Sequence, residues 1–266
     1  ADLYPGEAKT DRRDAFVIAD TARTRSGSVQ WLDVDSEELL QQLRVLNGFD
    51  VDLAADLTRH VNRLRDCLTA ISPVLEQVIG SRLQHAGVRD LIARFPTLTA
   101  LHSAGRSRIA ATIKKRSPRL AGTATDAVMS ALDAQTVRIP AEAAIGRVIA
   151  ELARELERIH TRRDTLAGEI EEVFLAHPFG RVLVTLPGIG PRTGARILAE
   201  IGDASRFATG AKLASYAGLA PVTRQSGTSI RSESLPRRGN HRLKDAMFLA
   251  AFASLRSPDS KAFYDR

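Results

Sequence analysis

Apolar side chains recur at spacings of three and four along two stretches of the chain. In the first stretch they occupy Ala54, Leu57, Val61, Leu64, Leu68, Ile71, Leu75 and Val78. In the second they occupy Ile145, Ile149, Leu152, Leu156, Ile159, Leu166, Ile170 and Val173, and this seam is interrupted only at Arg163. A period that stays near 3.5 residues over three heptads is typical of a coiled coil, because a globular helix face drifts toward 3.6.

These seams predict two long helices, either as an antiparallel coiled coil or as a coiled-coil arm between two copies of the chain. An ordinary pair of core-facing helices is the alternative, and the constant period favours the coiled coil. Between the seams, residues 81–140 predict shorter helices that break at Pro96, Gly105, Pro118 and Pro140. A basic run there, residues 114–119, predicts a solvated loop or an auxiliary contact to a nucleic-acid backbone.

Composition agrees with a mainly α-helical fold. Aromatic residues make up only 5% of the 266 residues, whereas Ala, Leu, Ile, Val and Arg are abundant. Two further helices are expected, from Glu7 to Thr24 and after a capping Ser36. Cys67, the single cysteine, lies among apolar helix positions, which predicts a buried thiol rather than a nucleophile. No apolar run has the length of a membrane span and no secretory signal opens the chain, so we expect a cytoplasmic protein.

The net charge of +7 is concentrated in the C-terminal third. Residues 177–266 contain 14 Lys and Arg against 6 Asp and Glu, whereas residues 1–176 contain 24 against 25. A basic excess confined to one segment suits binding to phosphates, because each neutralised phosphate releases counterions. For the charge alone, a solvated basic face is an equally good interpretation.

The most specific local pattern is the glycine-containing turn of residues 186–194. One helix is expected to end near Thr185 and the next to begin at Pro191, where the missing N–H group would have no helical partner anyway. Gly188 and Gly190 allow a sharp turn and a close approach of a partner to the free N–H groups of the second helix. This is a helix-hairpin-helix pattern, which holds a DNA backbone without reading its sequence. The alternative, a plain glycine-capped turn, needs only one glycine.

Basic residues cluster around and behind this turn. Those predicted to contact DNA are Arg192, Arg196, Arg224, Arg231, Arg237, Arg238, Arg242 and Lys244. Among them lies Ser226, which precedes Gly227 in a predicted loop flanked by arginines. Such a serine can attack a phosphodiester phosphorus while arginines stabilise the developing charge. A flexible exposed hairpin is the plainer interpretation, and the sequence assigns no histidine or lysine base to this serine.

Asp11 and Asp14 form the third candidate site. Carboxylates three positions apart in a helix project from one turn and can share a divalent cation, as two-metal phosphoryl transfer requires. Two acids do not complete such a site. A solvated helix face with arginine partners is the alternative.

Taken in order, these motifs resemble one family, the DEDD transposases of insertion sequences. The resemblance is carried by residues 9–15, 186–191, 218–221, 226–227 and 237–240. Members of this family are RuvC-like recombinases guided by an RNA that bridges target and donor DNA. The middle of the chain is similar to them in arrangement more than in residues.

The resemblance implies a RuvC-like domain with four acidic metal ligands, a helical arm that joins subunits, and a C-terminal domain with a catalytic serine. The corresponding boundaries here are 1–30 for the end of the RuvC-like domain, 31–176 for the coiled-coil arm and 177–266 for the transposase domain. The implied partners are DNA, a guide (bridge) RNA and further copies of the chain.

Within this resemblance Asp11 and Asp14 match the last two acids, which implies Mg²⁺ at these residues. Ser226 matches the catalytic serine, because it precedes a glycine and stands thirteen residues before Gly239. Ser229 is the second choice. The implied mechanism is attack of Ser226 on DNA to form a covalent phosphoserine intermediate.

The family's first aspartate and its glutamate should precede Asp11 by tens of residues, whereas only ten residues precede it here. We therefore expect a fragment of a longer protein that binds DNA and RNA and forms oligomers but does not cut strands. A non-catalytic helix-hairpin-helix DNA-binding protein with a coiled-coil spacer is a second hypothesis. A structural coiled-coil protein with an incidental basic tail is a third.

Overall fold

The computed structural model describes residues 10–24, 38–135, 140–226, 230–234, 236 and 238–266. In this part the chain is mainly helical, as predicted, and its strands form one two-stranded antiparallel sheet. The elements before the sheet are α1 (Asp11–Thr24), α2 (Glu38–Ile71), α3 (Pro73–Gly80), α4 (Ala86–Arg94), α5 (Leu98–Arg116), α6 (Ala121–Asp133), α7 (Glu142–Ala176), α8 (Pro178–Leu183), α9 (Pro191–Ile201), a 3₁₀ turn (Ala204–Arg206) and α10 (Gly210–Tyr216). The sheet and the elements after it are β1 (Val222–Ser226), β2 (Ile230–Ser234), α11 (His241–Ser254) and α12 (Pro258–Tyr264).

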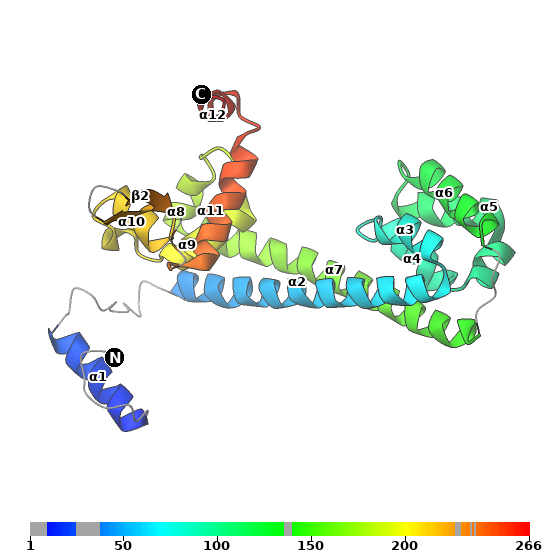
Figure 1. Ribbon diagram of the computed structural model, residues 1–266, viewed down its shortest axis with the longest axis horizontal. Coiled ribbons are helices and arrows are strands. Elements are labelled where there is room, and N and C mark those ends of the chain that lie inside the picture. Colours follow the sequence, from blue (N-terminus) through cyan, green and yellow to red (C-terminus); the bar gives the residue numbers. More distant parts are fainter. Residues whose placement is uncertain (1–9, 25–37, 136–139, 227–229, 235, 237) are drawn as a thin grey trace.

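Two long helices form the spine of the molecule. α2 and α7 contain 34 and 35 residues, which corresponds to about 50 Å each. They run side by side in opposite directions (Figure 1). The second seam faces inward, since α7 buries Ile149, Leu152, Leu156, Ile159, Leu166 and Ile170. The predicted antiparallel packing is therefore present, while supercoiling of the pair and pairing with a second copy stay predictions.

The first seam ends earlier than predicted. α2 stops at Ile71 because Pro73, which has no backbone N–H to donate, opens the separate helix α3. The hydroxyl of Ser72 caps α3 by accepting a hydrogen bond from the Leu75 N–H at 3.3 Å. Leu75 and Val78 therefore belong to α3, and their assignment to one continuous helix is wrong.

The buried side of α2 also begins earlier than predicted. Leu40 and Leu43 are buried, and the buried positions continue through Asn47, Asp50 and Leu53. The spacing of three and four is thus the same as in the predicted seam. A search for apolar side chains does not detect this part of the buried side, because two of its positions carry polar residues.

The helices between the seams pack around the far end of the spine (Figure 1). The four predicted breaks are confirmed: α4 ends before Pro96, α5 turns at Gly105 (φ 67°) and ends before Pro118, and α7 begins after Pro140. Cys67 is half-buried in this region, and burial raises the pKa of its thiol. A raised pKa lowers the thiolate fraction at neutral pH, as the predicted unreactive thiol requires.

The basic run of residues 114–119 begins inside a helix rather than in a loop, since its first three residues are the last turn of α5. Lys114 and Lys115 are exposed. Arg116 instead pairs with Glu157 of α7 at 2.5 Å and lies 3.6 Å from the carboxylate of Asp90. Part of this basic run therefore holds the far helices on the spine.

The near end of the spine carries the C-terminal elements, which we call the C-terminal body (residues 178–266). α9 packs on α2, on α7 and on α11. It can lie close to α7 because residue 194 is a glycine: a Cβ there would stand 2.5 Å from the ring of Phe174, a fully buried side chain. Ile197, Leu243 and Ala246 form the apolar contact between α9 and α11.

α1 buries none of its residues and lies apart from the spine in Figure 1. The predicted start of this helix at Glu7 and the predicted cap Ser36 lie outside the described residues. Among the described helices, none combines the length and the apolar character needed to cross a membrane.

Candidate nucleic-acid interface

The turn between α8 and α9 follows the predicted course. α8 ends at Leu183, and Pro191 opens α9 at its first helical position. Gly190 precedes α9 and offers no side chain to accept from the N–H groups of the first turn. A Cβ on Gly190 would meet no atom within 4 Å. This side of the turn is therefore open, and an anion can approach these N–H groups.

Gly188 faces the protein rather than the open side of the turn. Its φ is 82°, and a Cβ on it would collide with the carbonyl oxygen of Ala250 and stand 2.5 Å from the backbone nitrogen of Ser254. The close approach that this glycine permits is thus made to the last turns of α11. Contact of Gly188 with DNA stays a prediction. The packing against α11 already explains why a glycine is needed at this position, whether or not the turn binds DNA.

Two motifs that are distant in the sequence meet at the base of the hairpin. Gly218 (φ 68°) and Gly239 (φ 115°) approach so closely that a Cβ on Gly239 would lie 2.7 Å from the Cα of Gly218. Next to them, the Asn240 Nδ2 donates to the Glu200 carboxylate at 2.7 Å and to the Tyr216 hydroxyl at 3.1 Å, while the Asn240 Oδ1 caps α11. This junction fixes both ends of the hairpin on α9 and α11.

The segment predicted as a loop around Ser226 contains two paired strands. β1 runs antiparallel to β2, with Ser226 opposite Ile230 and Arg224 opposite Ser232. The alternative of a hairpin is therefore confirmed, whereas the assignment of Ser226 itself to a loop is wrong, because backbone pairing across the strands extends to this residue. Ser226 is the last residue of β1, whereas the alternative serine, Ser229, and also Arg237 lie outside the described residues.

Asp50 joins the two long helices to α9. Its side chain is 3% exposed and accepts from Arg163 Nε at 2.8 Å and from Arg196 Nη2 at 2.8 Å. Burial alone would raise the pKa of Asp50, but the hydrogen bonds and charges of these two arginines outweigh burial and hold the pKa below its usual value. Arg192 joins the cluster by donating to the Arg163 carbonyl oxygen at 2.8 Å. Arg192 and Arg196 therefore hold the fold together, and their contacts with DNA stay predictions.

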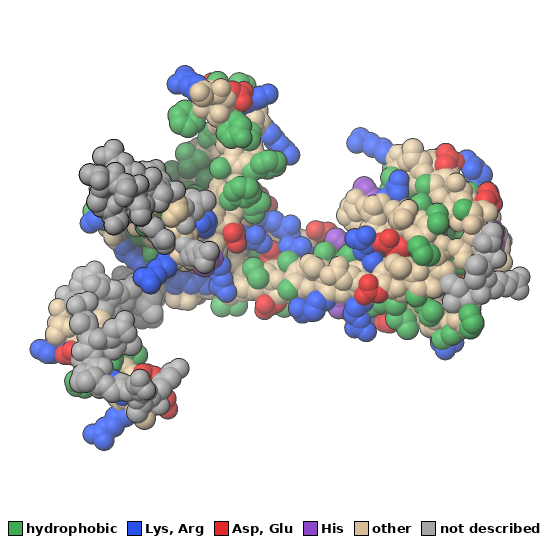
Figure 2. Space-filling model, in the orientation of Figure 1, with side chains coloured by type: hydrophobic (Ala, Val, Ile, Leu, Met, Phe, Trp, Pro, Cys, Tyr) green, Lys and Arg blue, Asp and Glu red, His purple; other side chains and the backbone are tan. Residues whose placement is uncertain are grey.

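Other predicted DNA-binding residues are more open to a partner. Arg238 is exposed, and the Arg242 side chain is 77% exposed and lies 3.9 Å from the Glu200 carboxylate. Lys244 is half-buried. Arg224 and Arg231 are described only by their places in the strands. Arg224 pairs with Ser232, and Arg231 pairs with Gln225. Figure 2 shows Lys and Arg side chains gathered where α2 meets the C-terminal body.

Asp11 and Asp14 are exposed on the first turn of α1. Within the described ranges, no three or more His, Cys, Asp or Glu side chains gather as a metal site. Mg²⁺ is commonly held by one or two carboxylates with waters in its other positions, so Asp11 and Asp14 fit this ion as part of such a site. The structure also does not bring these acids together with Ser226, because α1 lies apart from the hairpin in Figure 1.

Comparison with known proteins matches both ends of the chain to transposase families. A family model for DEDD transposases of IS110 type, described as Transposase, matches residues 1–73, and one described as Transposase IS116/IS110/IS902 family matches residues 180–265. An IS110 element protein of Streptomyces coelicolor is 47% identical over the whole chain. The chain belongs to the IS116/IS110/IS902 family of transposases.

Further relatives of this chain come from other insertion elements. The IS900 protein of Mycobacterium paratuberculosis is 36% identical over 100% of the chain, and the IS116 protein of Streptomyces clavuligerus is 34% identical over 98% of it. The chain spans about two thirds of the length of these relatives, with coverage of 66%, 66% and 65% for the IS110, IS900 and IS116 proteins. The IS116/IS110/IS902 match coincides with the C-terminal body.

Sequence reasoning missed two polar residues, Asn47 and Asp50, and it named Asn240 only as part of the family motif, without the contacts that its side chain makes. A signal for Asp50 existed, because Arg163 breaks one seam and Asp50 breaks the spacing that precedes the other. Opposite charges that interrupt two seams of packed helices predict an ion pair between them. Asn240 carried the signal of a helix cap directly before α11.

Proposed function

We propose that this chain supplies the DNA-binding C-terminal part of an insertion-sequence transposase. The observation that carries the proposal is the match of residues 180–265 to the IS116/IS110/IS902 transposase family. These residues form one body in which α9 and α11 hold the open turn at Gly190 and the hairpin. The basic excess of residues 177–266 lies in the same body and favours contacts with backbone phosphates.

Binding of the chain to duplex DNA is expected to weaken steeply with salt. Arg238→Ala should lower the affinity and reduce the slope of log affinity against log salt by about 1, because one phosphate contact is lost. Fluorescence anisotropy with a labelled duplex at several salt concentrations measures both quantities. Arg108→Ala, which removes an exposed charge from α5 at the far end of the spine, is the matched control. Salt-independent binding, or an equal loss in both variants, would contradict the proposal.

We further propose Ser226 as the nucleophile of strand cleavage, with Ser229 as the second choice. The family resemblance supports it, and so does the position of Ser226 at the end of β1, next to the Gly227 of the motif. In this step the Ser226 Oγ loses its proton and forms a bond to a DNA phosphorus. The bond from that phosphorus to one strand end breaks, and the released hydroxyl end takes up a proton. Attack by another strand hydroxyl on the phosphoserine then reforms a phosphodiester and frees the serine.

Ser226→Ala should abolish covalent protein–DNA adducts while leaving DNA binding within about twofold, because the hydroxyl is the only group removed. Adducts are measured by denaturing electrophoresis with labelled DNA, in a full-length protein that carries these 266 residues. Ser229→Ala is the matched control and should retain adducts. Adducts at the wild-type level in Ser226→Ala would exclude this serine, and their loss only in Ser229→Ala would select the second choice.

The family resemblance supports three further parts of the proposal. Asp11 and Asp14 would contribute to a Mg²⁺ site completed by other carboxylates, where the ion stabilises charge on the transferred phosphate. A bridge RNA would select the target, and the long helices would join copies of the chain. Chelation of divalent ions should then remove adducts in the full-length protein without removing DNA binding.

A further inference from the structure

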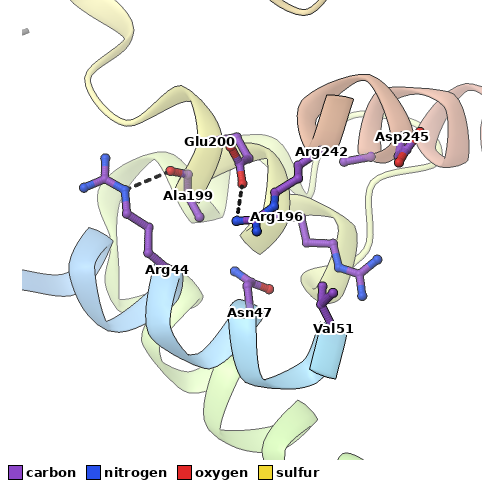
Figure 3. A pocket seen from close by; sticks show the side chains of 10 residues that line it. Arg44, Asn47, Val51, Arg196, Ala199, Glu200, Arg242 and Asp245 are labelled. Atoms are coloured by element: carbon purple, nitrogen blue, oxygen red, sulfur yellow. Dashed lines mark hydrogen bonds and ion pairs between the residues drawn. The ribbon is translucent and has the colours of Figure 1, made fainter. Parts of the chain in front are cut away.

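A cavity of about 200 Å³ lies where the spine meets the C-terminal body. Its polar lining consists of Arg44 and Asn47 from α2, Arg196 and Glu200 from α9, and Arg242 and Asp245 from α11. Figure 3 shows these side chains around one space between the three helices, with Arg242 close to Glu200 and Arg44 turned toward Ala199. The cavity therefore joins two parts of the molecule, and a ligand in it would contact both.

Asn47 is the buried polar residue among those that line this cavity. It is 9% exposed, and its Nδ2 is buried with no hydrogen-bond partner among the described residues. The amide points into the space between α2 and α9 in Figure 3. A buried donor without an acceptor costs free energy, and at this seam position an apolar side chain would pack without that cost. The amide is therefore placed to donate to an acceptor atom that a ligand supplies.

The charges of the lining favour an anion. Arg242 lies 3.9 Å from Glu200, which exceeds hydrogen-bonding distance, so its guanidinium retains donors for a ligand. One oxygen of Glu200 is already used by Asn240, which donates to it at 2.7 Å. The lining thus holds three arginines and two carboxylates, and one of the arginines, Arg196, is also paired with Asp50.

The arginines are also held in place. Arg44 donates from Nε to the carbonyl oxygen of Ala199 at 3.1 Å, and Arg196 is held by Asp50 at 2.8 Å. The contact with Asp50 uses only some of the donors of the planar Arg196 guanidinium. Because these side chains are already ordered, a bound anion does not have to order them.

We propose that this cavity binds one phosphate group of a nucleic-acid strand, which accepts hydrogen bonds from Asn47 Nδ2 and from the guanidinium groups of Arg196 and Arg242. A phosphate suits the site because its oxygens only accept, as these donors require. The inference rests on the proposed function, since it adds a second nucleic-acid contact to the same body. DNA and RNA share this group, and either strand held here would touch the spine and the C-terminal body together.

Asn47→Leu is the decisive variant. It removes the buried donor and leaves an apolar side chain of similar size, so the melting temperature without ligand should stay equal or rise. In wild type, inorganic phosphate should raise the melting temperature above that in chloride of equal ionic strength, because a ligand that binds the folded state stabilises it. Asn47→Leu should lose this difference and bind a labelled strand about tenfold more weakly.

Arg242→Gln is the second variant, and its exposed side chain makes a folding defect unexpected. It should also lose the phosphate effect and weaken binding about tenfold. Arg256→Gln is the matched control, because it removes one exposed charge from the same body outside the cavity lining. Each variant is titrated with duplex DNA and with single-stranded RNA, and the strand whose affinity falls in the two cavity variants is the one bound there.

Wild-type affinity for both strands and an unchanged phosphate effect in Asn47→Leu and Arg242→Gln would overturn this proposal. An equal loss in Arg256→Gln would also overturn it, since the effect would then follow net charge alone. If the wild-type chain binds no duplex DNA, the proposed function fails independently. The cavity is then judged by the phosphate effect and the RNA titration.

Discussion

Gly188→Ala should lower the free energy of unfolding by about 3 kcal/mol. The new Cβ would meet the backbone of α11 at Ala250 and Ser254, and φ of 82° is unfavourable for any side chain. Backbone cannot move aside as a flexible side chain can, so the turn and α11 must separate. Urea denaturation followed by circular dichroism measures the loss.

Gly190→Ala is the control from the same turn. A Cβ there meets nothing within 4 Å and φ is −94°, so the free energy of unfolding should change by less than about 0.5 kcal/mol. Equal stability of the two variants would contradict the packing described for Gly188. The pair also separates folding from recognition, because weaker DNA binding in Gly190→Ala alone would point to the open side of the turn.

Asp50→Asn should destabilise the protein by about 3 kcal/mol at neutral pH, because two arginines lose the buried carboxylate that neutralises them. Asp52→Asn is the control, since Asp52 is exposed on the same helix. Its stability should change by less than about 0.5 kcal/mol. Denaturant midpoints of the two variants and of wild type give the comparison, and an equal loss in both would exclude a special role of Asp50.

The difference between wild type and Asp50→Asn should depend on pH in a defined direction. The pKa of Asp50 lies below its ordinary value of 3.8 in the folded protein. The stabilisation by the carboxylate is therefore complete above that ordinary value and is lost as the pH falls through the lower folded-state pKa. A difference that stays constant from neutral to strongly acidic pH would show that the charge of Asp50 is not the cause.

Local signals in the sequence predicted much of the fold. The seam of α7, the breaks at Pro96, Gly105, Pro118 and Pro140 and the start of α9 at Pro191 each depend on periodicity or on the backbone limits of one residue. Such features need no knowledge of what packs against them.

Other features depend on partners distant in the sequence, and these were missed. Asn47 and Asp50 lie at buried positions of α2, and the two arginines that bind Asp50 come from α7 and α9. The junction of Gly218 with Gly239 also joins residues that are distant in the sequence. The cavity likewise needs three helices at once. Local periodicity does not contain that information.

The assignment of Ser226 as the nucleophile stays a prediction. Ser226 was selected through resemblance to a family. The structure adds that its backbone ends β1 and pairs with Ile230 of β2. Of the arginines expected to contact DNA at the glycine-containing turn, Arg192 and Arg196 have intramolecular partners that a count of charges cannot reveal.

The lengths of the two spine helices fix the distance between the C-terminal body and the far helices. Each residue added to a helix lengthens it by about 1.5 Å, so one heptad inserted in both α2 and α7 would move the far helices outward by about 10 Å. A seven-residue insertion nearly preserves the facing side, whereas a shorter one rotates the far helices about the long axis. The lengths of α2 and α7 therefore set both the spacing and the orientation of whatever the two ends hold.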